Sequence, residues 1–333
     1  MCRSLKGSPV SSENKRWLLA MVIAASTLPL ATGHAVEASA CPDIKTQPFP
    51  LIKIAKDTYV RKGAHETFEK NNFAAIANVS VVIGQRSIAV IDTGGSYCDG
   101  KRFLAAIRGL SNKPISHVIN THSHPDHIFG NAAFVEEKPA FLGHANLPRA
   151  IAEKGPHYLE NLQRLVGKER MLGTKLITPT TTVKGEKVID LGKRILELRA
   201  HPTAHTDHDL TVFDRSTKIL WAGDLLFHEH IPVLDGSLKG WMATLETLQT
   251  IPAKKVVPGH GGPLLLWPDA LTPQKSYFTK LSQDLTKILK AGGTMAEAQT
   301  QAGQAEKRSW LLFHHYNPRN AAAAYAELEW EVE

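Results

Sequence analysis

The pattern of hydrophobic and polar positions predicts strands and helices that alternate along the first half of the chain. Short runs rich in β-branched residues predict strands at residues 79–83 and 88–91, and apolar positions with the helical period follow between residues 103 and 110. The next apolar run, residues 118–121, predicts another strand. Strand, helix and strand in this order are typical of an α/β fold in which sheets and helices form separate layers.

Strands return in the second half of the chain. Residues 196–200 alternate between apolar and charged side chains, which predicts a strand with one buried face. The apolar runs 210–213 and 219–222 predict two further strands, and we expect the second of these to end at Asp224. A short strand at residues 256–257 completes the pattern.

The last part of the chain has a helical pattern. Residues 277–289 share an apolar face with the helical period, and residues 294–297 form the capping box that is typical of a helix start. Asn317 and Pro318 predict the cap and the first position of a final helix over residues 321–330.

The first 40 residues have the pattern of a secretory signal peptide. Lys15 and Arg16 precede a short apolar run, and small residues offer cleavage sites between Ala35 and Ala40. The run is shorter than the roughly 20 residues that a membrane-spanning helix needs. We therefore expect a periplasmic or secreted protein with no stable membrane insertion after cleavage. An uncleaved anchor is the alternative.

Three cysteines occur in the sequence, at Cys2, Cys41 and Cys98. Cys2 would leave with the signal peptide, so two cysteines remain in a chain expected to meet an oxidising environment. Their spacing does not show that they meet. A disulfide and two unlinked thiols are both open.

The composition excludes several classes of protein. With 43% hydrophobic and 21% charged residues, the chain of 333 residues is not disordered and has enough apolar material for a sizeable core. The formal net charge is +7, but no run of five or six like charges occurs, so we expect no nucleic-acid partner. The 16 histidines are the unusual feature, because several lie close together.

Four potential metal ligands lie close together at the end of a predicted strand. His122 and His124 point to the same side of an extended segment, because side chains alternate there. Pro125 suits the first position of a helix, so Asp126 and His127 project from its opening turn at a different angle. Imidazole and carboxylate are usual zinc ligands, and two such pairs suit two neighbouring metal ions.

Three further candidates lie downstream, each beside the end of a predicted strand. They are His205, Asp224 and His260. His201 and His208 flank His205 and are its rivals as a ligand.

In their order along the chain, these pieces resemble the metallo-β-lactamase superfamily. Its pattern consists of an early Asp, H-x-H-x-D-H, and then His-Thr, Gly-Asp and Gly-His pairs; here these are Asp92, residues 122–127, His205-Thr206, Gly223-Asp224 and Gly259-His260. His205 is preferred over its rivals because it alone precedes Thr. The resemblance implies an αββα sandwich formed by residues 41–265, with residues 266–333 as a helical extension packed on the same domain.

The resemblance also implies a role for each ligand. One metal ion would lie on His122, His124 and His205, and a second on Asp126, His127 and His260, with Asp224 as the bridge. Asp92 would brace the histidine loop by hydrogen bonds. We expect two Zn²⁺ ions, with iron or manganese as alternatives.

Three stretches are similar to one branch of the superfamily, the exported zinc metallohydrolases of quinoprotein dehydrogenase relay systems, which are related to hydrolases of sulfur-oxidation clusters. The stretches are residues 126–134, 235–241 and 326–330. This similarity implies a functional link to a quinoprotein dehydrogenase.

From these observations we expect a hydrolase that cleaves an ester, thioester, lactone or amide bond of a small molecule by means of a metal-bridging hydroxide. Asp224 and Asp126 would be catalytic, with Asp126 as a proton acceptor. The alternatives are a metallo-β-lactamase, a mononuclear iron persulfide dioxygenase and, in a different class, a non-catalytic periplasmic metal-binding accessory protein.

Overall fold

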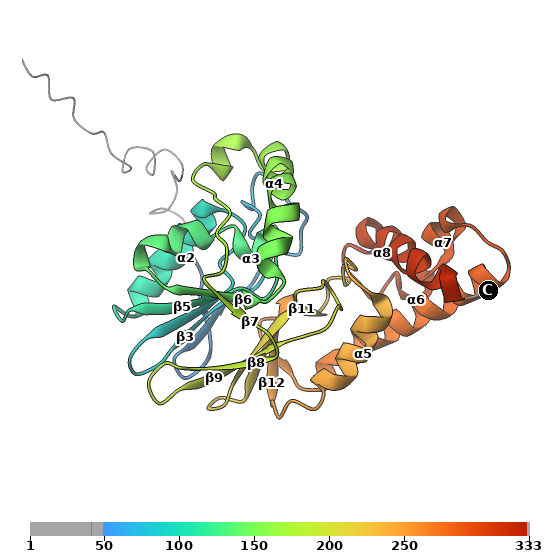
Figure 1. The fold of residues 1–333 in the computed structure, drawn as a ribbon. Helices are drawn as coiled ribbons and strands as arrows, with labels where there is room; N and C mark the ends of the chain where they lie inside the picture. The colour runs from blue at the N-terminus through green and yellow to red at the C-terminus, as the bar shows by residue number, and fades with distance from the viewer. Residues whose placement is uncertain (1–40, 42–48, 332–333) are drawn as a thin grey trace, which may run out of the picture.

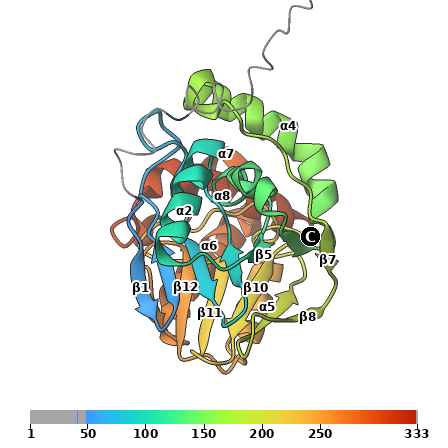
Figure 2. The ribbon, with the colours of Figure 1, turned by 90° about the vertical axis from the view of Figure 1, so that its left-hand side faces the viewer.

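Two β-sheets packed face to face form the centre of the molecule, and helices cover both outer faces (Figures 1 and 2). The computed structural model describes Cys41 and residues 49–331. The expected signal peptide, residues 1–40, lies outside the described residues. The layered α/β fold that the sequence predicts is confirmed.

The first sheet has seven strands, which lie in the order of the sequence. Neighbours are antiparallel from β1 to β4 and parallel from β4 to β7. The strands are β1 (Ile52–Ala55), β2 (Thr58–Arg61), β3 (Val79–Ile83), β4 (Ile88–Ile91), β5 (Ile115–Ile119), β6 (Ala140–His144) and β7 (Thr181–Val183). The strands predicted at residues 79–83 and 88–91 are confirmed.

The second sheet has six strands in the order β13-β12-β11-β10-β9-β8. Only β11 and β12 pair in parallel among its neighbours. The strands are β8 (Glu186–Asp190), β9 (Ile195–Ala200), β10 (Leu210–Asp214), β11 (Ile219–Phe227), β12 (Lys255–His260) and β13 (Leu265–Leu266). Apolar side chains from both sheets, such as Val82 and Leu198, fill the space between them.

Helices pack on the outer face of each sheet. They are α2 (Tyr97–Leu110), α3 (Pro125–Ile128), α4 (Leu147–Leu165), α5 (Leu238–Leu248), α6 (Thr272–Lys290), α7 (Met295–Gln301) and α8 (Phe313–Leu328). Short 3₁₀ turns are η1 (Asn131–Glu137), η2 (Lys168–Met171), η3 (Asp269–Leu271), η4 (Gln304–Glu306) and η5 (Glu329–Glu331). Phe103 of α2 and Phe134 of η1 pack on the first sheet, while Trp241 of α5 and Phe278 of α6 pack on the second.

Two of the predicted boundaries are wrong. Strand β11 does not end at Asp224 but continues to Phe227, because its pairing with β12 resumes at Phe227 after register shifts on either side of Gly223, where φ is +53°. Helix α8 begins at Phe313, so Pro318 lies inside it. Asn317 does not cap the helix; its side-chain amide accepts from Tyr277 and donates to the backbone of Ala302 instead.

The C-terminal helices share a hydrophobic core with the second sheet. Leu220 and Phe227 of β11 lie in the same cluster as Leu281 of α6 and Ala321 of α8. Helices α6 and α8 thus pack on the second sheet, while the domain boundary expected at residue 265 stays a prediction. The capping box that begins α7 is present, with Thr294 and Glu297 bonded to each other's backbone N–H groups.

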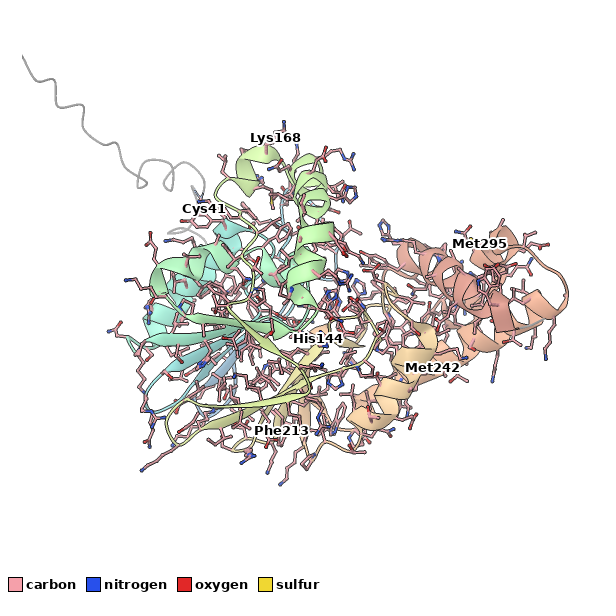
Figure 3. All side chains as sticks on the ribbon, in the orientation of Figure 1. Cys41, His144, Lys168, Phe213, Met242 and Met295 are labelled. Carbon is pink, nitrogen blue, oxygen red and sulfur yellow. A yellow bond between two sulfur atoms is a disulfide. The ribbon has the colours of Figure 1, made fainter. Side chains whose placement is uncertain are left out.

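Cys41 and Cys98 are joined by a disulfide (Figure 3). The bond ties the start of the described chain to helix α2, and both residues are buried against Phe73. The alternative of two unlinked thiols is therefore not the arrangement in the structure.

Within the described part of the chain, no helix has the length and hydrophobicity to cross a membrane.

Candidate metal centre

The histidine-rich segment forms a loop and one helical turn after β5. Pro125 is the first residue of α3, which the sequence predicts, and it needs no backbone N–H there. His122 and His124 precede the turn, with ring centroids 4.7 Å apart, and Asp126 and His127 lie within it. The segment therefore presents its ligands as two pairs from two directions.

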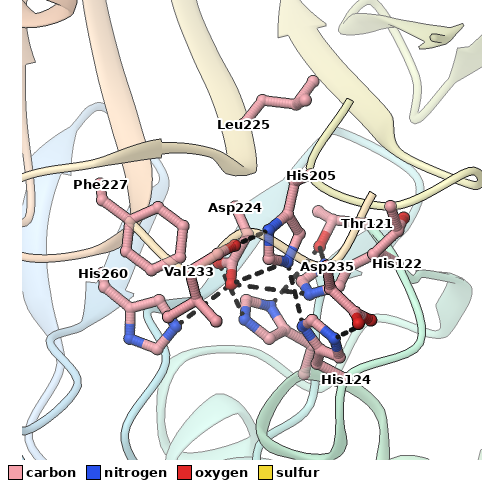
Figure 4. A network of polar contacts seen from close by, with 12 residues as sticks. Thr121, His122, His124, His205, Asp224, Leu225, Phe227, Val233, Asp235 and His260 are labelled. Atoms are coloured by element: carbon pink, nitrogen blue, oxygen red, sulfur yellow. Dashed lines mark hydrogen bonds and ion pairs between the residues drawn. The ribbon is translucent and has the colours of Figure 1, made fainter. Parts of the chain in front are cut away.

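Seven side chains converge in two groups that could each hold a metal ion. Figure 4 shows His122, His124, His205, Asp224 and His260 among them. The first cluster consists of His122, His124, His205 and Asp224, and the second cluster consists of Asp126, His127 and His260. Within each cluster, the potential ligand atoms lie within 4.8 Å of one another. The six residues other than Asp224 are divided as the resemblance implies, and Asp224, which it implies as a bridge, is grouped with the first cluster.

Asp224 contacts both clusters. Its Oδ2 lies 3.6 Å from His122 Nε2 and 3.4 Å from His260 Nε2, and its Oδ1 lies 3.1 Å from His127 Nε2. One carboxylate thus reaches nitrogen atoms of the first cluster and of the second. This is the position that a bridging ligand would take.

Two glycines allow Asp224 to take this position. A Cβ on Gly259 of β12 would lie 1.8 Å from Asp224 Oδ1, and a Cβ on Gly223 would lie 2.7 Å from Thr121 Cβ. Gly223 also has a positive φ, which favours glycine. Close packing therefore explains why a glycine precedes both Asp224 and His260.

Each of the five histidines uses one ring nitrogen for a contact that fixes its ring and turns the other nitrogen inward. A partner of this kind sets the tautomer and orientation of a metal-binding imidazole. The contacts are His122 Nδ1 with Thr121 Oγ1 (3.1 Å), His124 Nε2 with Asp235 Oδ2 (3.2 Å), His127 Nδ1 with Asp92 Oδ2 (2.8 Å), His205 Nδ1 with the Val233 carbonyl (2.7 Å) and His260 Nδ1 with the Ile76 carbonyl (3.1 Å).

Asp92 braces the histidine loop in the manner expected from the sequence. It follows β4 with φ at +56°, and its carboxylate accepts from both the backbone N–H and the hydroxyl of Thr121 as well as contacting His127. Asp235 plays the corresponding part for His124, and it also pairs with Lys154 of α4 at 3.1 Å. No sequence pattern connects Asp235 with His124, because 111 positions separate them.

Helix α8 fixes the segment that carries Val233 and Asp235. Asn320, which is fully buried, accepts a hydrogen bond from the backbone N–H of Leu234 (2.9 Å) and donates one to the carbonyl of Pro232 (2.6 Å). The C-terminal helices therefore hold the two groups that orient His124 and His205. They form part of the centre's support as well as a cover for the sheet.

Several buried ligand atoms have no hydrogen-bond partner in the described structure. These atoms are His122 Nε2, His127 Nε2 and Asp224 Oδ1. A buried polar atom without a partner is costly, and it is rare in a folded protein. The atoms point into the space between the two clusters, and imidazole nitrogen with carboxylate oxygen is a donor set that zinc and similar cations prefer. The residues therefore fit divalent metal ions.

The electrostatics of the centre also favour a cation. Burial alone lowers the pKa of His260, but Asp224 and Asp126 more than offset this effect and raise that pKa to about 9. Burial alone raises the pKa of Asp224, but His260 and His127 hold it well below its usual range. The carboxylates thus stay ionised and attract positive charge, which metal ions can supply in place of protons.

A pocket opens over the centre. Its volume is about 360 Å³, and its floor includes His124, Asp126, Asp224 and His260. Its walls come from α4, from α8 and from the segment around residue 68. A small molecule that enters the pocket meets the inward-facing atoms of both clusters.

The rival histidines, His201 and His208, lie outside the two clusters. His201 Nε2 contacts Thr211 Oγ1 at 2.8 Å, and His208 Nε2 contacts Ser123 Oγ at 2.8 Å. Neither belongs to the two clusters among the described residues. Burial lowers the pKa of each to about 4, so both are neutral hydrogen-bonding groups near the site.

Sequence reasoning missed several residues of the pocket wall. No motif in the sequence marks His315, Tyr316, Arg319 or Asn161, yet all of them line the pocket. They lie on helices that carry no metal-ligand pattern. The amphipathic pattern of a helix shows which face is buried, but it does not show which residues border a cavity.

Sequence comparisons agree with this geometry. The model of the metallo-beta-lactamase superfamily matches residues 74–260. A linear primary-alkylsulfatase of Pseudomonas sp. is 26% identical over 218 residues, which are 53% of this chain and 40% of the alkylsulfatase. The acyl-coenzyme A thioesterase MBLAC2 of Gallus gallus is 26% identical over 209 residues, which are 55% of this chain and 72% of the thioesterase.

Solved structures share the fold. The sec-alkylsulfatase Pisa1 from Pseudomonas sp. has a TM-score of 0.64 and 16% identity, covering 86% of this chain and 54% of that one. A metallo-beta-lactamase from Pontibacter korlensis has a TM-score of 0.56 and 22% identity, covering 69% of this chain and 98% of that one. The family match, the αββα layers and the order of the motif pieces all agree: the chain belongs to the metallo-beta-lactamase superfamily.

Proposed function

We propose that this protein is a metal-dependent hydrolase of small molecules that acts on an ester, thioester, lactone or amide. One observation carries the proposal: five imidazole nitrogens and two carboxylates converge as two clusters joined by Asp224 at the floor of a pocket. Such an arrangement suits two divalent ions. Zinc is the ion we propose, with iron or manganese as alternatives.

In this proposal, His122, His124 and His205 would hold one ion, Asp126, His127 and His260 would hold the other, and Asp224 would contact both. Such ions would supply Lewis acidity and a nucleophile at neutral pH. The side chains fix the geometry of both sites before substrate binds, because a hydrogen-bond partner orients each imidazole ring.

Asp126 is proposed to accept a proton during the reaction. It lines the pocket, and its Oδ2 lies 3.3 Å from His260 Nε2. Burial alone raises the pKa of Asp126, but His127 and His260 lower it below its ordinary value. The carboxylate is therefore ionised at neutral pH and able to take a proton.

Sulfate esters are a second class of candidate substrate. The matched alkylsulfatase of Pseudomonas sp. and the thioesterase of Gallus gallus carry names that specify sulfate-ester and thioester cleavage, respectively. The panel that tests the proposal therefore contains an aryl ester, an acyl thioester, a lactone, a primary alkyl sulfate and a β-lactam. We expect turnover of at least one of the first four, loss of turnover with a chelator, and recovery when zinc is restored. Slow or absent β-lactam cleavage would exclude a metallo-β-lactamase.

Metal analysis separates a hydrolase from an iron dioxygenase and from a metal-binding accessory protein. An iron persulfide dioxygenase would contain one iron ion per chain and consume oxygen with a persulfide. An accessory protein would bind metal but turn over no member of the panel. Two metal ions per chain together with hydrolysis would support the proposal against both.

We also propose export to the periplasm or to the medium, and a functional link to a quinoprotein dehydrogenase. The leader pattern of residues 1–40 and the disulfide support export, because disulfides persist in oxidising compartments. Mass spectrometry of the protein from an exporting host should find a mature terminus between Ala35 and Ala40 and an oxidised Cys41–Cys98 pair. An intact Met1 on a cytoplasmic protein would contradict export.

Asp224→Asn should abolish most of the activity. The substitution keeps the shape but removes the negative charge that offsets the repulsion between two dications. We expect hydrolysis of the best panel substrate to fall at least about 100-fold, which corresponds to about 2.7 kcal/mol. Circular dichroism should be unchanged, because the site lies beside Gly223 of β11 rather than between the sheets. Wild-type metal content with near wild-type turnover would refute the bridged arrangement.

Asp235→Asn and Asp92→Asn should weaken different metal sites. Asp235 orients His124 of the first cluster, and Asp92 orients His127 of the second. Loss of such a partner commonly lowers metal affinity by about 10–100-fold. Zinc titration of chelator-treated protein should therefore show one weakened site in each variant, and a different site in each. If both variants weaken the same site, the assignment of the supporting carboxylates is wrong.

A further inference from the structure

A series of rings in tilted contact leads from the metal centre toward the exposed end of the pocket at Arg319. The ring of His260 lies 5.1 Å from that of His230, and His230 lies 5.3 Å from Tyr316 of α8. The guanidinium of Arg319, one turn further along α8, lies 5.8 Å from the centre of the Tyr316 ring. All four residues line the pocket. A ligand that extends outward from the centre therefore passes two rings and then meets Arg319.

The charge of Arg319 is not neutralised by the protein. Arg319 is the only lysine or arginine among the described residues that line the pocket, and no carboxylate in the described chain pairs with it. The acidic residues of the pocket lining are Asp126 and Asp224, which belong to the metal clusters. An arginine is always charged at physiological pH, so the mouth of the pocket carries a permanent cation that contacts an aromatic ring but no described carboxylate.

The opposite wall adds a second hydrogen-bond donor. Asn161 of α4 lines the pocket, and its Oδ1 accepts from Arg164 at 2.6 Å, which leaves the amide NH₂ group as its free donor. Phe68 and Leu165 give the same wall an apolar surface. The pocket thus has metal ligands at its floor, apolar and aromatic walls, and donors at its mouth.

We propose that Arg319 binds an anionic group of the substrate, so that the substrate is an ester or thioester with an apolar body and a terminal oxyanion. The inference rests on the proposed hydrolase function and adds the substrate class. A guanidinium recognises carboxylate and sulfonate groups through paired N–H donors, and its position over Tyr316 restricts its orientation. Binding of the anionic group by Arg319 would place the scissile bond at the metal centre, beyond the rings of Tyr316 and His230.

The expected effect is moderate because Arg319 is exposed to solvent. Water and salt screen an exposed ion pair, so binding and not the chemical step should depend on it. We expect Arg319→Gln to raise KM for an anionic ester about tenfold and to change kcat less than about twofold.

The test compares phenyl hexanoate, which is neutral, with two carboxylate esters: the monophenyl ester of adipic acid and 4-carboxyphenyl hexanoate. These place the anion on the acyl side and on the leaving-group side. The variants are Arg319→Gln and Arg319→Lys, with Arg308→Gln as control, because Arg308 is an exposed arginine of the same C-terminal segment and does not line the pocket.

Arg319→Gln should raise KM for the carboxylate ester that the wild type prefers and leave phenyl hexanoate unchanged. Arg319→Lys should restore part of the loss, Arg308→Gln should have no effect, and added salt should reduce the wild-type preference. Equal effects on charged and neutral esters, or no effect on any, would overturn the anion subsite.

A binding measurement separates this inference from the hydrolase proposal. Calorimetry with 4-phenylbutyrate, 3-phenylpropanesulfonate and the neutral 4-phenylbutanamide should show weaker binding of the anions, but not of the amide, to Arg319→Gln. Repeating the calorimetry with chelator-treated protein excludes binding of the anion by direct coordination to a metal ion. Arg319-dependent binding without turnover would remove the hydrolase proposal and retain the subsite. Turnover of phenyl hexanoate without Arg319-dependent binding would retain the hydrolase proposal and overturn the anion subsite.

Discussion

The buried carboxylate of Asp224 is the interaction on which the rest of the centre depends. It is 4% exposed and lies between nitrogen atoms of two histidine clusters, where a negative charge without compensation would be very costly. The fold accepts this group because Gly223 beside it adopts a positive φ and Gly259 leaves room for its carboxylate. A buried site that holds two ionised carboxylates among five imidazoles is preorganised for cations.

The hydrogen-bond partners of the histidine ring nitrogens connect the centre to the outer parts of the molecule. Glu327 of α8 accepts hydrogen bonds from the Ser237 hydroxyl and the Leu238 backbone, both at 2.6 Å, directly after Asp235. Two of the stretches that resemble the quinoprotein-associated branch, residues 235–241 and 326–330, thus bind each other. The C-terminal helices consequently determine both how the first cluster is oriented and which side chains line the pocket.

The sequence predicted the parts of this structure that local chemistry determines. The β-branched runs placed β3 and β4, and Pro125 placed the start of α3, because those patterns have few alternative structures. The ligand candidates were identifiable because ligands at strand ends have a recognisable order. The continuation of β11 past Asp224 was not predictable from the strand pattern, since it depends on irregular pairing with β12. Asp235 and Asn320 were missed because their partners are distant in sequence.

The position of Arg319 shows why substrate recognition is harder to find in the sequence than metal binding. Metal ligands need particular residue types, so their pattern is visible even without a structure. A residue at the mouth of a pocket needs only a charge and a location, and the location depends on where α8 packs against the second sheet. Pro318 precedes Arg319 inside α8, although a proline there is more typical of a helix start. Helices that follow the core motif therefore supply pocket residues that the metal-binding motif does not specify.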